Sequence, residues 1–168
     1  VRPDRVMLGG AVVEEETSAE ELREIFGLLG KLDNRLGIYY VYGNHDRQPY
    51  TDSSTYTDQE LADTIVENGI RILENECLAV TDDLLLVGRG DSAWGNVMQR
   101  PTVAEILGDA DRGKLIVTVD HQPVEAAENG ASGVDIQLSG HTHAGQIWPT
   151  GMINRLMGNL NYGRYEKN

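Results

Sequence analysis

Four histidines are the residues in this chain with the clearest capacity for chemistry: His45, His121, His141 and His143. Each follows a predicted strand within five residues, and ligands of α/β sheets collect beyond the carboxyl ends of strands. Imidazole binds transition metals such as zinc, iron or manganese together with oxygen ligands. One such histidine would be explained more readily as a surface or hydrogen-bonded residue. Four at equivalent strand ends indicate one shared site.

His141 and His143 stand two residues apart on a predicted tight loop that follows Gly140. This spacing lets the side chains of one loop bind two neighbouring metal ions, or hold one ion between them. The glycine permits the backbone turn that presents both rings. The spacing therefore predicts a metal site of one or two ions.

Asn44, His45 and Asp46 form a second polar group, directly after the strand predicted at 38–42. The Asn44 amide offers a neutral oxygen ligand, and His45 is placed to face a substrate. Asp46 is placed to hold the His45 ring in one tautomer. Alternatively, the three residues form a turn or a helix cap, since Asn and Asp favour such positions. The functional interpretation requires the other histidine loops to lie beside Asn44.

The chain is acidic, with a formal net charge of −13 and a pI near 4.6. Nucleic acid is therefore not expected as a partner, because phosphate contacts need clustered Lys and Arg. Bound metal ions could still supply local positive charge for phosphate chemistry. No apolar run approaches the about 18 residues of a membrane span. The chain starts at Val1 in the middle of its pattern of strands and helices, so a targeting segment could precede this residue. We expect a cytoplasmic or peripheral membrane protein.

Short apolar runs alternate with capped helices, which predicts an α/β fold in a single domain over residues 1–168. Strands are predicted at 6–8, 38–42, 70–73, 77–80, 84–87, 115–119 and 134–138. Helix starts are predicted at the capping boxes Ser18–Glu21, Thr57–Glu60 and Thr102–Glu105, and at Pro123 for a helix that ends at Asn129. The Gly- and Asn-rich stretch from Ile147 predicts a loop.

Three blocks resemble, in order and separation, the signatures of calcineurin-like metallophosphoesterases: Gly43-Asn44-His45-Asp46, His121-Gln122-Pro123 and Gly140-His141-Thr142-His143. Two further stretches resemble a bacterial branch whose members are often membrane-associated: Leu86-Val87-Gly88-Arg89 and His143-Ala144-Gly145-Gln146. The resemblance covers nearly the whole chain. It implies a sandwich of mixed β-sheets flanked by helices.

By this resemblance, Asn44, His121 and His141 ligate one metal, and His143 ligates another. His45 protonates the leaving group or stabilises charge on the phosphoryl oxygens. The implied cofactor is a divalent transition metal (Mn, Fe or Zn), and the implied reaction is hydrolysis of phosphomonoesters or phosphodiesters by metal-activated water. A fold does not name a substrate. The acidic composition favours small-molecule or lipid phosphoesters over long polyanions.

The chain departs from the family pattern in three places. It has no Asp-x-His block on its first strand, Ala11 stands where an Asp bridges the two metals, and the last strands of the family are missing before Asn168. We therefore expect a sandwich that is incomplete at both ends. Glu14 aligns with the later acidic residue of the bridging block. The run Glu14-Glu15-Glu16 is nevertheless interpreted as a solvated surface.

Several origins fit these departures: a truncated or processed chain, an engineered Ala11, a natural relative that no longer uses two metals, or a homodimer that exchanges strands. An open sheet edge invites the last of these. The alternative to an active hydrolase is a catalytically impaired member of the fold that binds metal or phosphoester.

Smaller signals surround the predicted cleft. Arg89 is interpreted as a rim or structural residue, and the alternative is a contact with substrate phosphate. Trp94, Met98 and Arg100 are expected on a loop beside the cleft, and Trp148 either lines the substrate pocket or covers a sheet edge.

Overall fold

The computed structural model describes residues 2–92, 100–143, 148–157, 160 and 162–166. Its strands are β1 (Val6–Leu8), β2 (Ile38–Tyr40), β3 (Ile70–Ile72), β4 (Glu76–Thr81), β5 (Leu84–Gly88), β6 (Leu115–Val119) and β7 (Ile136–Leu138). Its helices are α1 (Ala19–Leu29), α2 (Asp58–Glu67), α3 (Val103–Leu107), α4 (Ala126–Ala131) and α5 (Thr150–Leu156).

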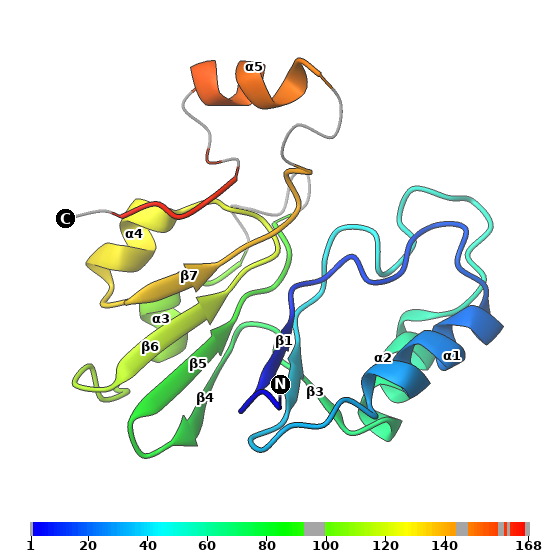
Figure 1. The fold of residues 1–168 in the computed structure, drawn as a ribbon, viewed down its shortest axis with the longest axis horizontal. Coiled ribbons are helices and arrows are strands. Elements are labelled where there is room, and N and C mark those ends of the chain that lie inside the picture. Colours follow the sequence, from blue (N-terminus) through cyan, green and yellow to red (C-terminus); the bar gives the residue numbers. More distant parts are fainter. Residues whose placement is uncertain (1, 93–99, 144–147, 158–159, 161, 167–168) are drawn as a thin grey trace.

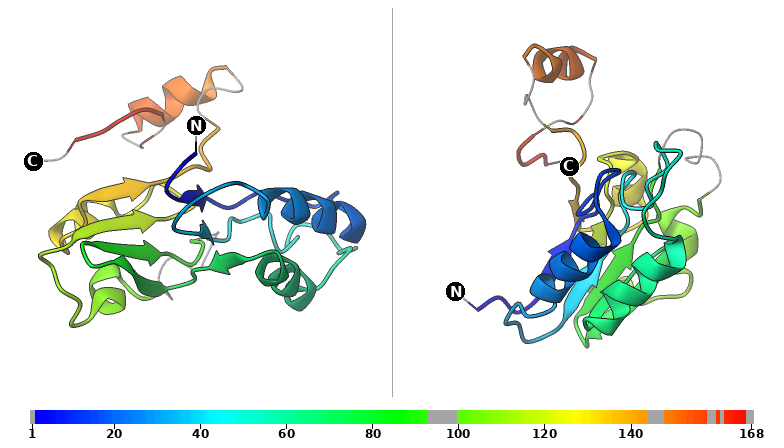
Figure 2. Two further views of the ribbon diagram at one scale, coloured as in Figure 1. Left: turned by 60° about the horizontal axis from the view of Figure 1, so that its bottom comes forward. Right: turned by 90° about the vertical axis from the view of Figure 1, so that its right-hand side faces the viewer.

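The described strands form two sheets, of order β1-β2-β3 and β4-β5-β6-β7. The first sheet is parallel throughout. The second is mixed, because β4 and β5 are antiparallel whereas β5, β6 and β7 are parallel. Figures 1 and 2 show the two sheets packed against each other, with α1 and α2 on the outer side of the first and α3 and α4 beside the second. This arrangement confirms the predicted α/β sandwich flanked by helices, although only the second sheet is mixed.

Successive side chains of β2 point to opposite faces of the sheet and therefore pack into two different hydrophobic cores. Tyr39 packs between the sheets, together with Leu86 and Val117 of the second sheet. Its neighbour Tyr40 points to the opposite face, as strand geometry requires. There the Tyr40 ring meets the ring of Phe26 from α1, edge to face with centroids 5.5 Å apart. The first sheet is therefore fully buried at β2, from which the Asn44 loop emerges.

All three predicted capping boxes are present and confirm the starts of α1, α2 and α3. At each, the Ser or Thr side chain accepts from a backbone amide three residues on, and the Glu at that position reaches back to the cap. This reciprocal pairing satisfies two amides that a helix start leaves open. The helices are thereby fixed against the sheets, with Leu22 and Phe26 of α1 buried.

The helix predicted from Pro123 to Asn129 begins later than the sequence indicates. Glu125 has a left-handed backbone, with φ of 57°, and α4 starts only at Ala126. A left-handed residue cannot belong to a right-handed helix. Pro123 therefore lies in the turn that follows β6, and the predicted helix start is wrong.

The prediction of a loop from Ile147 is also wrong, because this stretch contains α5. Its first turn closes when the amides of Met152 and Ile153 donate to the carbonyl of Pro149. Gly and Asn lower helix propensity, but propensity is only a weak guide to structure. Figure 1 shows α5 standing away from the two sheets. Among the helices of the described residues, none has the length and apolar character needed to cross a bilayer.

Candidate metal centre

The candidate ligands project from three loops that follow parallel strands. Asn44 follows β2, His121 follows β6, and His141 follows β7. β6 and β7 are parallel neighbours, and their pairing continues past the strands, since the Gly140 amide donates to the His121 carbonyl at 3.0 Å. The His121 and His141 loops are therefore adjacent at one end of the second sheet. The Asn44 loop reaches them from the first sheet.

The side chains of Asn44, His121 and His141 meet at their polar atoms. Oδ1 of Asn44 lies 3.0 Å from Nε2 of His121 and 3.0 Å from Nδ1 of His141, and the two nitrogens are 3.2 Å apart. Ligands of one transition metal, at about 2.0–2.2 Å from it, lie roughly 3 Å from each other. The three atoms thus have the mutual spacing of one face of a coordination shell.

The other hydrogen bonds of His121 and Asn44 leave no proton between Nε2 of His121 and Oδ1 of Asn44. Nδ1 of His121 lies 2.7 Å from the carbonyl oxygen of Gly9, which can only accept, so Nδ1 carries the proton and Nε2 presents a lone pair. The Asn44 amide nitrogen donates to the Tyr50 hydroxyl at 3.4 Å, which turns Oδ1 toward the histidines. Nε2 of His121 and Oδ1 of Asn44 are then two acceptors in contact. A cation beside them would relieve this contact, so the residues present fit a metal ion.

Burial favours the neutral form of the His141 imidazole, which is the form that metals require. Burial, followed by the nearby His121, lowers the pKa of His141 below its usual value. At neutral pH, His141 is therefore ready to donate a lone pair without first losing a proton.

The backbone around the cluster is tightly constrained. A β-carbon on Gly43 would lie 2.4 Å from the Ala11 amide nitrogen and 2.8 Å from the His121 ring, so only glycine fits. Ala11 and His141 have left-handed backbones, with φ of 51° and 64°. Such conformations cost of order 1–3 kcal/mol and gather at functional sites. Asp and Asn adopt them more readily than Ala. The backbone at Ala11 therefore suits the aspartate that the resemblance implies at this position.

His143 lies close to the cluster, but its side chain is not one of the three that meet there. Its side chain is exposed, its backbone is left-handed with φ of 47°, and its charge contributes to the lowered pKa of His141. Within the described residues, no group of three or more His, Cys, Asp or Glu side chains is positioned to hold a metal. The gathered set is two imidazoles and one amide, and a ligand role for His143 stays a prediction.

His45 is oriented by a glutamate that the sequence interpretation treated as solvated. Nδ1 of His45 lies 2.7 Å from Oε2 of Glu15, with the two side chains 38% and 16% exposed. The predicted orienting residue, Asp46, does not make this contact. Both the Asp46 assignment and the solvated interpretation of Glu15 are therefore corrected. Thirty residues separate the partners, and no spacing rule could have paired them.

Asp46 instead holds the loop beneath the site. Its fully buried carboxylate accepts hydrogen bonds of 2.5–3.3 Å from the backbone amides of Ala11, Val12, Val13 and Gly43. Four amides around one carboxylate make a strong charge-assisted contact. Asp46 thereby ties the Ala11 loop to the turn that carries Asn44.

A buried ionic network lies behind His121. Arg100 donates to both carboxylate oxygens of Asp120, at 2.8 and 3.2 Å, and to Glu125 at 2.9 Å. Arg89 donates to Glu125 at 2.7 Å and is buried, in line with its structural interpretation. Burial raises the pKa of Asp120, whereas Arg100 opposes that rise. Because Asp120 directly precedes His121, the network holds the strand end that presents the ligand.

Other residues singled out in the sequence are less informative. Trp94 and Met98 lie outside the described residues. Arg100 donates to the Gly90 carbonyl at 2.6 Å. Trp148 is 84% exposed, so neither the pocket-lining nor the edge-covering role is visible.

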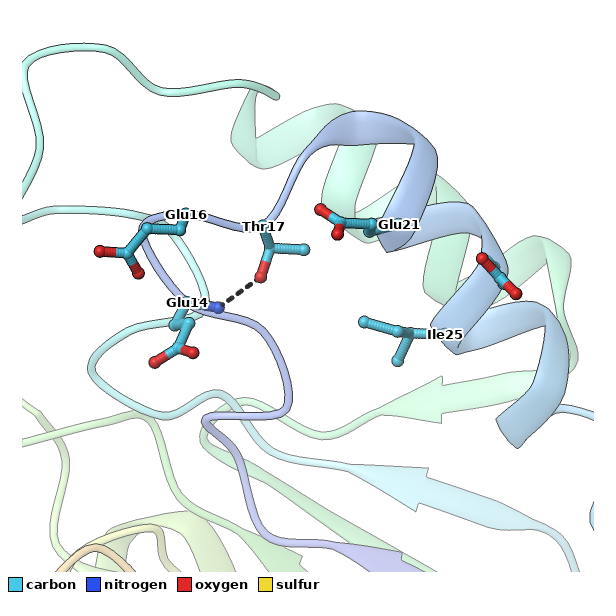
Figure 3. Close-up of a pocket in the computed structure, with 6 residues that line it drawn as sticks. Glu14, Glu16, Thr17, Glu21 and Ile25 are labelled. Carbon is cyan, nitrogen blue, oxygen red and sulfur yellow. Dashed lines mark hydrogen bonds between the residues drawn. The ribbon is translucent and has the colours of Figure 1, made fainter.

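A pocket beside α1 is unsuited to phosphate. Figure 3 shows its acidic lining, with the carboxylates of Glu14, Glu16 and Glu21 around Thr17 and Ile25. The Glu14 amide donates to the Thr17 hydroxyl at 3.0 Å. Clustered carboxylates repel anions. No histidine lines this pocket, so it is distinct from the candidate metal centre.

Two packed sheets whose strand-end loops bring Asn44, His121 and His141 together are the arrangement expected of a metallophosphoesterase. Residues 2–145 match the family model described as calcineurin-like phosphoesterase. The chain belongs to this family, whose members use divalent metals, and the predicted resemblance is confirmed. No solved structure matches it.

Curated relatives place the chain among larger proteins. It is 28% identical to an uncharacterized metallophosphoesterase of Campylobacter jejuni (98% of this chain, 42% of the relative). It is 30% identical to a transmembrane protein with metallophosphoesterase domain of Danio rerio (98% and 38%). It is 27% identical to the phosphodiesterase YaeI of Escherichia coli (87% and 51%). The chain therefore spans about two fifths to half the length of these relatives.

Proposed function

We propose that this chain hydrolyses phosphomonoesters or phosphodiesters with a divalent transition metal held by Asn44, His121 and His141. One observation carries the proposal: Oδ1 of Asn44, Nε2 of His121 and Nδ1 of His141 lie 3.0–3.2 Å apart, and the first two are acceptors in direct contact. A structural hydrogen bond would place a proton between those two atoms. Family membership and the phosphodiesterase name of one relative support the reaction class.

The protein side of the mechanism follows from the same geometry. When bound, the metal would lower the pKa of water and offset charge on the phosphoryl oxygens. His45 is half exposed, and Glu15 engages its Nδ1. The opposite ring nitrogen is then left to meet a substrate and to donate a proton to the leaving group. We further propose His143 as an additional ligand and small-molecule or lipid phosphoesters as substrates.

Metal content and turnover test this function together. The protein is stripped with a chelator and reloaded separately with Mn²⁺, Zn²⁺ or Fe²⁺. Bound metal is then measured by elemental analysis, and turnover with bis-p-nitrophenyl phosphate and p-nitrophenyl phosphate. His141→Ala should reduce metal content, whereas His45→Asn should abolish turnover but retain the metal. Glu16→Gln, an exposed change outside the cluster, is the matched control. Metal content that is unaffected by His141→Ala would refute the proposed ligand set.

A catalytically impaired, metal- or phosphoester-binding protein is the second candidate. It is favoured by Ala11 at the position of the expected bridging aspartate. Bound metal without turnover of either ester would select this candidate. A homodimer with exchanged strands is a separate proposal, and light scattering that shows only monomers would exclude it.

A further inference from the structure

Tyr50 lies beside two residues of the candidate site. Its ring meets the His45 ring edge to face, with centroids 5.3 Å apart and an interplanar angle of 62°. Its hydroxyl accepts from the Asn44 amide nitrogen at 3.4 Å. The residue is 54% exposed. Tyr50 therefore contacts both the proposed acid and a proposed ligand while keeping a free aromatic surface.

The backbone at Tyr50 is held in place by its neighbours. The buried Gln48 side chain donates to the carbonyls of Glu14, Glu15 and Thr17, at 3.0, 3.3 and 2.8 Å. Gln48 itself has a left-handed backbone with φ of 50°, and Pro49, next in sequence, restricts the chain further. The loop is therefore anchored to the segment that carries Glu15, and Tyr50 is presented from a fixed base.

Packing does not explain this tyrosine. Tyr40, Tyr42 and Tyr56 are buried and belong to the core beneath α1 and α2, but Tyr50 does not. Single exposed apolar side chains are ordinary on protein surfaces. Tyr50 differs because its two contacts are both with site residues and because its backbone is anchored. Its position is better explained by a ligand than by the fold.

We propose that Tyr50 contacts the leaving group and favours phosphoesters whose leaving group carries an aromatic ring. The inference rests on the proposed function, because a general acid must stand within hydrogen-bond reach of the leaving oxygen. A ring packed against His45 then borders the space that the leaving group occupies. Aromatic side chains bind flat rings by stacking and give little preference to short alkyl groups. Tyr50 is thus a specificity-determining residue.

Binding of two phosphonates tests the proposal without requiring turnover. Calorimetry of the Mn²⁺-loaded protein compares phenylphosphonate with methylphosphonate, which share the anionic group and differ in the ring. We expect phenylphosphonate to bind about tenfold more tightly. Tyr50→Ala should reduce this ratio to near one, whereas Tyr50→Phe should preserve it. Tyr162→Ala, which removes another exposed tyrosine, should leave the ratio unchanged.

The outcomes separate this inference from the hydrolase proposal. Equal affinities for the two phosphonates, binding of neither, or a ratio that survives Tyr50→Ala would each overturn the role of Tyr50. A Tyr50-dependent preference for the phenyl compound, with no hydrolysis of any ester, would support the role of Tyr50 in binding. It would contradict only the proposed hydrolase activity. Tyr50 is exposed, so its variants should fold, and thermal melting of each variant verifies this.

Discussion

Nδ1 of His45 and Oε2 of Glu15 lie 2.7 Å apart although they are thirty residues distant in sequence. The same turn that carries His45 also carries Gln48, whose amide holds the carbonyls of Glu14 and Glu15. The proposed acid and the carboxylate that contacts it are thus placed by one set of contacts. A hydrogen-bonded carboxylate selects the tautomer of an imidazole and its ring orientation.

Glu15→Gln should lower kcat by about tenfold or more with little change in KM, because general acids contribute through their alignment. Glu15→Asp should recover part of the loss, and Glu16→Gln should be neutral. A second measurement does not depend on turnover: ¹⁵N NMR of the His45 ring should show a proton on Nδ1 in the parent protein and a mixed tautomer in Glu15→Gln. Identical ring spectra would contradict the pairing.

Asp46→Asn should destabilise the protein by about 2–4 kcal/mol, since a buried carboxylate that accepts four backbone amides is replaced by a group that presents donors to them. Urea unfolding followed by circular dichroism measures the change. Asp52→Asn, at an exposed position, should alter stability by less than about 0.5 kcal/mol. Equal effects of the two substitutions would show that the carboxylate does not hold the loop.

Ala11→Asp should raise metal affinity by about tenfold or more, because it adds an anionic ligand beside Gly43 and His121 on a backbone that Asp adopts readily. Ala11→Asn is the matched control, with the same conformational preference and no charge. Calorimetric titration with Mn²⁺ compares the three proteins. An affinity that rises equally in both variants would assign the effect to relief of backbone strain.

Tyr56 should make the fold sensitive to alkaline pH. Burial, with the nearby charges of Asp46 and Glu15, raises the Tyr56 pKa to about 12, from an ordinary value near 10. Its neutral hydroxyl donates to the Asp46 carbonyl at 2.9 Å. The raised folded-state pKa means that this contribution is complete below pH of about 10 and is lost as pH rises toward about 12.

Tyr56→Phe cannot ionise and should therefore show a shallower loss of stability across that interval. Urea midpoints at pH 8, 10 and 11 provide the comparison, with Tyr162→Phe as an exposed control. Parallel declines in the parent and Tyr56→Phe would disprove a raised pKa at Tyr56.

Local patterns in the sequence were sufficient for much of the fold. Ser18, Thr57 and Thr102 with their partner glutamates mark helix starts correctly, because a capping box is complete within four residues. The alternation around Tyr39 and Tyr40 likewise reports two buried faces. Where a local pattern was weak, prediction was wrong: α5 begins in a Gly- and Asn-rich stretch, and a left-handed Glu125 delays α4.

The sequence by itself determined which residue types follow which strands, and the rule that ligands gather at strand ends then indicated one site for the four histidines. The family resemblance selected Asn44, His121 and His141 as the set that shares one metal. Only the tertiary structure decided that Glu15 orients His45 and that Asp46 turns inward to the Ala11 loop. It also placed Tyr50 between Asn44 and His45. The physical reason is range: caps and alternation act between near neighbours, whereas these pairings arise when loops from different strands are folded against one another.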